Sequence, residues 1–189
     1  TEWDGLVPAV QSGKIDAIIA GMSPTAERKE SIDFTDVYYT SDLVMVVKKG
    51  GKYENATKLS DFKGATITGQ LNTFHYTVID QIDGVKKDTA MDNFPAMRVA
   101  LESGKIDGYV SERPEGVSAT SANKNFAMVE FKEGQGFKTS DEDTAIAVGL
   151  KKDSDLKDKI NKILAGISED ERKDLMDQAI KDQPASEDN

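Results

Sequence analysis

The segment Ser12-Gly13-Lys14-Ile15-Asp16 occurs a second time, unchanged, as Ser103-Gly104-Lys105-Ile106-Asp107. In the first copy, a segment with helix character at residues 6–10 is followed by a run with strand character at residues 15–20. In the second copy, the corresponding segments are residues 94–101 and residues 106–111, and both strand-like runs begin with Ile. The glycine stands where a helix commonly ends in a left-handed residue. Both copies therefore predict a helix, a tight turn and a strand.

The repeated segment has two interpretations. A common helix-to-strand connection used twice would give this pattern, and so would two related α/β lobes. The copies stand too far apart for a solenoid period, so we interpret them as a duplicated architecture rather than a repeat array. The sequence thus predicts an α/β protein with two lobes.

Two apolar runs predict the connections between these lobes. Residues 43–47 and residues 144–149 both have the character of strands. We expect them to lie side by side as two hinge strands. Lobe one would then hold residues 1–43 and 148–189, and lobe two would hold residues 48–143.

The remaining elements are shorter or terminal. Residues 59–64 predict a short helix closed by glycine, and residues 65–68 predict the next strand. Apolar residues at helical spacing predict two terminal helices, from Leu156 to Ile167 and from Leu175 to Ile180. The charged run at residues 170–173 is most simply a solvated helix face.

Composition excludes several classes of protein. The chain has 189 residues, 38% of them hydrophobic, and carries 24 Lys and Arg against 34 Asp and Glu for a net charge of -10. Without a basic cluster, nucleic acid is not expected as a partner. The absence of cysteine excludes disulfides and thiolate sites. No apolar run reaches the roughly 18 residues of a membrane span, and Thr1 begins without a leader, so we expect a soluble chain whose targeting segment is missing.

Two charged residues follow strand ends, where open α/β sheets bind ligands. Arg28 can hold a carboxylate through two parallel hydrogen bonds, or it can pair at the surface with Glu27 or Glu30. Glu112 occupies the corresponding place in the second copy. It can hold an ammonium group, or it can cap a helix or pair with Arg113.

Other candidate residues are more ambiguous. Thr73 and nearby backbone N–H groups can bind an anion, although ordinary helix capping explains Asn72 and Thr73 equally well. Trp3 is the single tryptophan of the chain. Its indole either lines a binding site or, as is usual for a lone tryptophan, packs at the edge of the core. His75 is the single histidine and is expected at the surface. The chain has no Gly-x-Ser-x-Gly, Walker or Gly-x-Gly-x-x-Gly motif, so we expect no nucleophilic chemistry, metal or cofactor.

Three segments resemble a known family: residues 3–17 (WDGLVPAVQSGKIDA), 21–28 (GMSPTAER) and 32–39 (IDFTDVYY). They are similar to bacterial extracellular solute-binding proteins for polar amino acids, the receptor subunits of ABC importers. The resemblance runs from residue 1 through the terminal helices. It implies a two-lobed periplasmic-binding-protein-like fold of type II, with two hinge strands, outside the cytoplasm.

The resemblance also implies a ligand site. In similar proteins the residue matching Arg28 clamps the ligand α-carboxylate with help from the position of Thr73, and the residue matching Glu112 takes the α-ammonium. Trp3 matches an aromatic residue that flanks the ligand side chain. The further candidate ligand-binding residues are Ala20, Gly21, Met22, Ser23, Gln70, Asn72 and Phe74.

The sequence departs from the family pattern in two ways. A strand, helix and strand normally precede the position of Trp3, so lobe one is expected to be incomplete, the missing part being truncated, moved or supplied by a separate chain. Asn72 stands where a small residue is common, and Glu112 replaces the commoner Asp. The longer acid is expected to move the ammonium site by about one methylene.

The resemblance implies a receptor that closes on an amino acid and reports to ABC permease subunits. One alternative is an enzyme like the cyclohexadienyl dehydratases, with Glu112 as its general acid. Another is the effector domain of a larger receptor or transcription factor. Because an indole attracts cations by roughly 0.5 to 2 kcal/mol, Trp3 favours arginine, then lysine or histidine, with glutamine as the neutral alternative.

Overall fold

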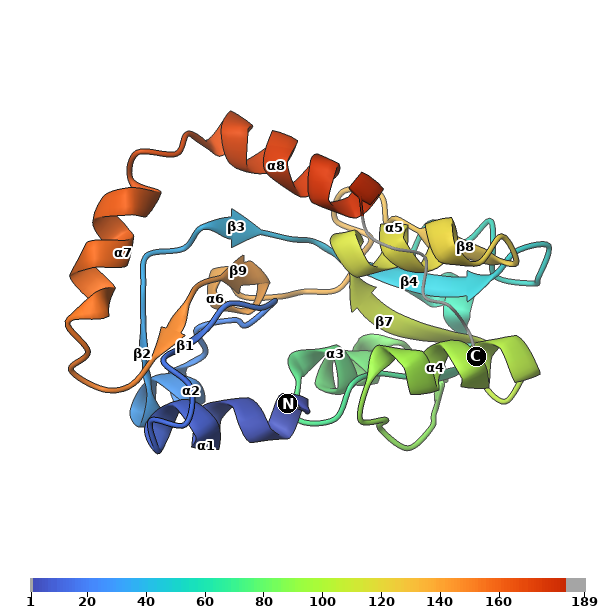
Figure 1. The fold of residues 1–189 in the computed structure, drawn as a ribbon. Coiled ribbons are helices and arrows are strands. Elements are labelled where there is room, and N and C mark those ends of the chain that lie inside the picture. Colours follow the sequence, from blue (N-terminus) through green and yellow to red (C-terminus); the bar gives the residue numbers. More distant parts are fainter. Residues whose placement is uncertain (1, 183–189) are drawn as a thin grey trace. The chain divides into compact units, whose positions relative to one another are not determined.

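The computed structural model describes residues 2–182 (Figure 1). These residues divide into two compact units. Within the described residues, unit one holds residues 2–41 and 140–179, and unit two holds residues 42–139 and 180–182. Each unit is a small α/β structure, in agreement with the predicted fold class.

Unit one is built around short antiparallel strands. Its elements are the 3-10 helix η1 (Trp3–Gly5), α1 (Leu6–Gln11), β1 (Ala17–Ile18), α2 (Ala26–Ser31), β2 (Asp33–Phe34), β3 (Tyr39–Thr40), α6 (Asp141–Thr144), β9 (Ala145–Ile146), β10 (Gly149–Leu150), α7 (Leu156–Leu164) and, as far as Ala179, α8 (Glu169–Asp182). Strand β10 lies between β1 and β2, and β3 pairs with β9. Val10, Ile18, Met22, Ile32, Phe34 and Ala147 form the core. Helix α1 therefore packs its apolar face on this sheet.

Unit two is a five-stranded mixed sheet with helices. Its elements are β4 (Leu43–Lys48), η2 (Leu59–Phe62), β5 (Thr66–Thr68), α3 (Phe74–Thr77), η3 (Val78–Gln81), β6 (Lys86–Lys87), α4 (Phe94–Ser103), β7 (Gly108–Glu112), α5 (Arg113–Ala122) and β8 (Phe126–Val129). The strand order is β6-β5-β7-β4-β8, with β4 antiparallel to both its neighbours. Successive residues of β4 face opposite sides, so Val46 packs with α4 and α5 while Met45 and Val47 pack with Phe62 and Ile79. The sheet is thus covered on both faces.

The repeated segment has the same local structure in both units. Gly13 and Gly104 adopt left-handed conformations, with φ of 73° and 78°. The hydrogen bonds also match: Lys14 N donates to Ala9 O and Lys105 N to Ala100 O, each at 2.9 Å. The predicted helix, turn and strand are confirmed in both copies, although β1 is shorter than the predicted strand at 15–20.

The predicted pairing of residues 43–47 with residues 144–149 is wrong. Residues 43–47 lie in β4, which pairs with β7 and β8 inside unit two. The partner of β9 is β3, which precedes the predicted hinge run. The physical reason is burial: Leu43 to Val47 are all buried, and a strand buried on both faces belongs in the middle of a sheet. The hinge motion itself stays a prediction.

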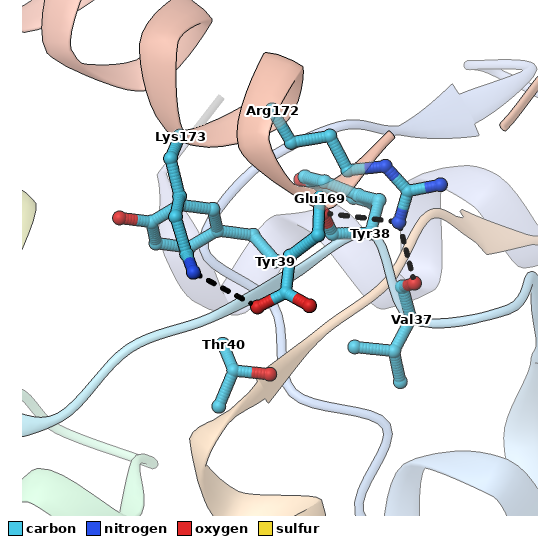
Figure 2. A pocket seen from close by; sticks show the side chains of 7 residues that line it. All are labelled: Val37, Tyr38, Tyr39, Thr40, Glu169, Arg172 and Lys173. Carbon is cyan, nitrogen blue, oxygen red and sulfur yellow. Dashed lines mark hydrogen bonds and ion pairs between the residues drawn. The ribbon is translucent and has the colours of Figure 1, made fainter. Parts of the chain in front are cut away.

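The charged run at the start of α8 is not wholly a solvated face. Arg172 is half-buried, and its guanidinium donates to the carbonyl oxygens of Val37 at 3.3 Å, Tyr38 at 3.5 Å and Leu164. Figure 2 shows the guanidinium pointing toward Val37 and Tyr38, and Arg172 is one of the residues that line a pocket of about 310 Å³. Arg172 therefore ties α8 to the end of α7 and to the segment before β3.

Replacing Arg172 with Met is expected to destabilise unit one by about 1.5 to 3 kcal/mol, because charge-assisted hydrogen bonds to three carbonyl groups are lost. Lys173→Met is a matched control on the next residue, since Lys173 is exposed and forms an ion pair with exposed Glu169 at 3.0 Å. Urea unfolding of both variants measures the difference. Equal midpoints for the two would contradict the role given to Arg172.

Candidate functional site

In unit one, Arg28 lies on α2 just after a loop that follows β1. The helix begins at Ala26 because the Thr25 side chain accepts a hydrogen bond from Arg28 N at 3.4 Å. The half-buried Arg28 guanidinium donates to the carbonyl oxygen of Ser23 at 3.0 Å and lies 5.5 Å from the centre of the Trp3 ring. A carbonyl and an indole thus hold a planar cation in a defined orientation, which suits a carboxylate ligand.

The loop from Ala20 to Ser23 is fixed by hydrogen bonds within unit one. Tyr38 Oη donates to the carbonyl oxygen of Ala20 at 2.9 Å, and Ser23 Oγ donates to that of Asp143 at 2.7 Å. The Met22 side chain is buried in the core, and its backbone oxygen accepts from Ala147 N. The structure therefore places Met22 as a core residue. Gly21 is exposed, and Ala20 is half-buried.

In unit two, Glu112 ends the buried strand β7 and is only 8% exposed. Its Oε1 lies 3.4 Å from His75 Nε2. Neither alternative explanation for Glu112 is realised: it makes no side-chain cap on α5, and Arg113 pairs with Glu130 at 2.9 Å. Glu112 therefore presents a buried carboxylate at the end of β7, next to the imidazole of His75.

The surface position predicted for His75 is wrong. The residue is only 6% exposed, because α3 packs against β7 and places the ring between Phe74 and Phe94, at centroid distances of 4.6 and 6.4 Å. Sequence reasoning missed it because one turn of helix shows no usable periodicity. The sequence did offer one signal that His75 lies near the site: it stands three residues after Asn72 and two after the candidate residue Thr73.

The loop before α3 is shaped by Asn72, whose φ of 56° is left-handed. The Thr73 hydroxyl is buried and donates to the carbonyl oxygen of Gln70 at 2.8 Å, and the Gln70 side chain donates to Asp92 O at 3.1 Å. Thr73 makes no side-chain cap on α3. Phe74 is half-buried beside His75. The predicted residues of this loop therefore lie together near one end of β5, with Gln70 held by the protein itself.

A polar network supports the start of α5, directly after Glu112. Glu115 accepts from Arg98 at 2.8 Å, from Ser111 at 2.7 Å and from Tyr109 at 3.3 Å. Burial raises the pKa of the Tyr109 phenol, and the neighbouring Glu115 carboxylate raises it further. The network keeps the helix that follows Glu112 in place, and the sequence alone did not indicate it.

Within residues 2–182, no three acidic or histidine side chains are grouped in a way that would ligate a metal ion. Over the same span, every helix is too short or too polar to cross a bilayer.

One protein family matches nearly the whole chain. Residues 1–181 match the family described as bacterial extracellular solute-binding proteins, family 3. The chain belongs to this family.

Relatives and a solved structure agree with this assignment. The chain is 29% identical over 169 residues to the arginine-binding extracellular protein ArtP of Bacillus subtilis, covering 86% of this chain and 62% of ArtP. It is 31% identical over 180 residues to the glutamine-binding protein GlnH of the same organism, covering 95% and 63%. The amino acid ABC transporter substrate-binding protein AbpA of Streptococcus pneumoniae, bound to L-arginine, matches with a TM-score of 0.80 and 26% identity, covering 96% of this chain and 74% of AbpA. The chain thus spans less than two thirds of the two curated relatives.

Proposed function

We propose that this chain is part of the substrate-binding component of an ABC importer and binds a polar L-amino acid outside the cytoplasm. The observation that carries the proposal is the Arg28 guanidinium, oriented by the Ser23 carbonyl and the Trp3 ring. Such a fork binds the α-carboxylate by two parallel hydrogen bonds. Family membership and relatives named as arginine- and glutamine-binding proteins support it.

The α-ammonium group is assigned to Glu112 of unit two. A carboxylate that is 8% exposed and ends a strand offers a desolvated negative charge, where an ion pair with an ammonium is stronger than at the surface. Thr73 is assigned to the carboxylate end of the ligand, and Ala20, Gly21 and Ser23 to further polar contacts. In this assignment the protein binds and releases its ligand without turnover, and ABC permease subunits are its partners.

The ligand side chain is assigned to the vicinity of Trp3. The Arg28 guanidinium lies over this ring, so a cationic ligand group would use the remaining indole surface. The net charge of -10 steers cations toward the protein by its long-range field. Both features favour a cationic side chain, and we rank arginine before lysine and histidine, with glutamine as the neutral alternative.

Competition calorimetry on the full-length protein tests the choice of ligand. Arginine should bind most tightly, and glutamine should bind about 2- to 30-fold more weakly, which corresponds to a cation–indole attraction of roughly 0.5 to 2 kcal/mol. Glutamate and aspartate should be the weakest. Tightest binding of glutamate or glutamine would show that Trp3 does not select the side chain.

A further inference from the structure

His75 is the only histidine of the chain, and its imidazole is buried in unit two. In residues 2–182, the interactions of its ring are with Glu112, Phe74 and Phe94. Nδ1 is buried without a hydrogen-bond partner in this part of the chain. Among the described residues, the hydrogen-bonding partner of the ring is therefore the carboxylate to which we assign the ligand ammonium.

The charges around this pair come from few elements. Glu112 belongs to β7, and the nearest turn of α4 contributes the apolar ring of Phe94. Farther along α4, Arg98 is held by Glu115 of α5. Next to His75 on its own helix, Tyr76 lies under Lys87, which pairs with Asp80 of η3 at 2.9 Å. The other charges are thus committed to partners of their own.

The two protonation states of the ring have opposite effects on the carboxylate. A neutral imidazole with its proton on Nε2 donates to Glu112 Oε1 and leaves the negative charge for a ligand. A protonated imidazole cancels that charge, and it also carries a buried Nδ1–H that lacks an acceptor. A proton on His75 and an ammonium beside Glu112 therefore compete for one carboxylate.

We propose that His75 is a positioning residue for Glu112 that makes amino-acid affinity depend on pH. The neutral ring orients the carboxylate for the ligand ammonium, and the protonated ring takes the carboxylate for itself. This inference rests on the proposed function, because it needs the ammonium at Glu112. A proton on His75 and a ligand ammonium at Glu112 exclude each other, so affinity falls as the pH decreases and ligand binding releases a proton.

Calorimetry of L-arginine binding to the full-length protein at pH 8 and pH 5.5 tests this. We expect the wild-type Kd to be about 5- to 10-fold higher at pH 5.5 than at pH 8. His75→Phe keeps the ring packing and His75→Asn keeps a donor, and both remove the titration. Each variant's Kd ratio between the two pH values should stay near 1. A ratio equal to that of the wild type would overturn the proposal.

A second measurement keeps the two proposals separate. His75 is the single histidine of this chain, so the Hε1 proton of its ring can be followed by NMR as the pH is changed. The midpoint should move to lower pH in Glu112→Gln, which removes the charge that stabilises the protonated ring, and also when arginine is added. No movement in Glu112→Gln overturns the coupling even if arginine binds. If no amino acid binds at pH 8, the proposed function is refuted, and with it the effect of His75 on ligand affinity. A midpoint that still moves in Glu112→Gln would then show that His75 and Glu112 are in contact all the same.

Discussion

Replacing Arg28 with Lys is expected to weaken amino-acid binding by about 1.5 to 3 kcal/mol, or roughly 10- to 150-fold in Kd. Lysine keeps the positive charge but presents a point charge instead of a planar fork, so the paired hydrogen bonds to a carboxylate are lost. The contacts that orient the guanidinium, to the Ser23 carbonyl and the Trp3 ring, are lost with it. Isothermal titration calorimetry on the full-length protein measures the change.

A control from the same helix separates this effect from a general change of charge. Lys29 is the next residue of α2, and its exposed ammonium pairs with Glu142 at 2.6 Å. Lys29→Met removes one positive charge close to Arg28 and should leave Kd within a factor of about two, since exposed charges are screened. Unchanged affinity in Arg28→Lys, or an equal loss in Lys29→Met, would remove Arg28 from the site.

The substitution Gly69→Ala is expected to destabilise the protein by about 3 kcal/mol, the upper end of overpacking costs. A Cβ on Gly69 would lie 2.6 Å from the His75 carbonyl oxygen, 2.7 Å from its carbonyl carbon and 2.8 Å from Tyr76 N. All three are backbone atoms, so the turn of α3 has to move away from the end of β5. Urea unfolding should show a lower midpoint with little change in slope.

Gly166→Ala is the matched control, because its nearest neighbour would be the Ile163 carbonyl oxygen at 3.3 Å. Its unfolding free energy should change by no more than about 1 kcal/mol. Because Gly69 packs against the backbone of His75, Gly69→Ala should also change the NMR titration of the His75 ring. Stability equal to the wild type in Gly69→Ala would contradict the close approach of β5 and α3.

Local features of this protein were determined by the sequence alone. The repeated segment defines a helix, a left-handed glycine and a strand in both units, because hydrogen bonds between residues a few positions apart form this turn. The same proximity along the chain places Arg28 shortly after β1 and Glu112 at the end of β7. Motif resemblance then indicated the family, which the match over residues 1–181 confirms.

Partners far apart in the sequence were decided only by the tertiary structure. The apolar run at residues 43–47 indicates a strand, but its pairing with β7 and β8 depends on which surfaces it buries. Likewise, the contacts of Arg172 with Val37 and of His75 with Glu112 join segments whose spacing carries no periodic signal. The residue pattern of a helix or strand indicates which of its sides is apolar. Which other helix or strand packs against that side is decided only when the whole chain folds.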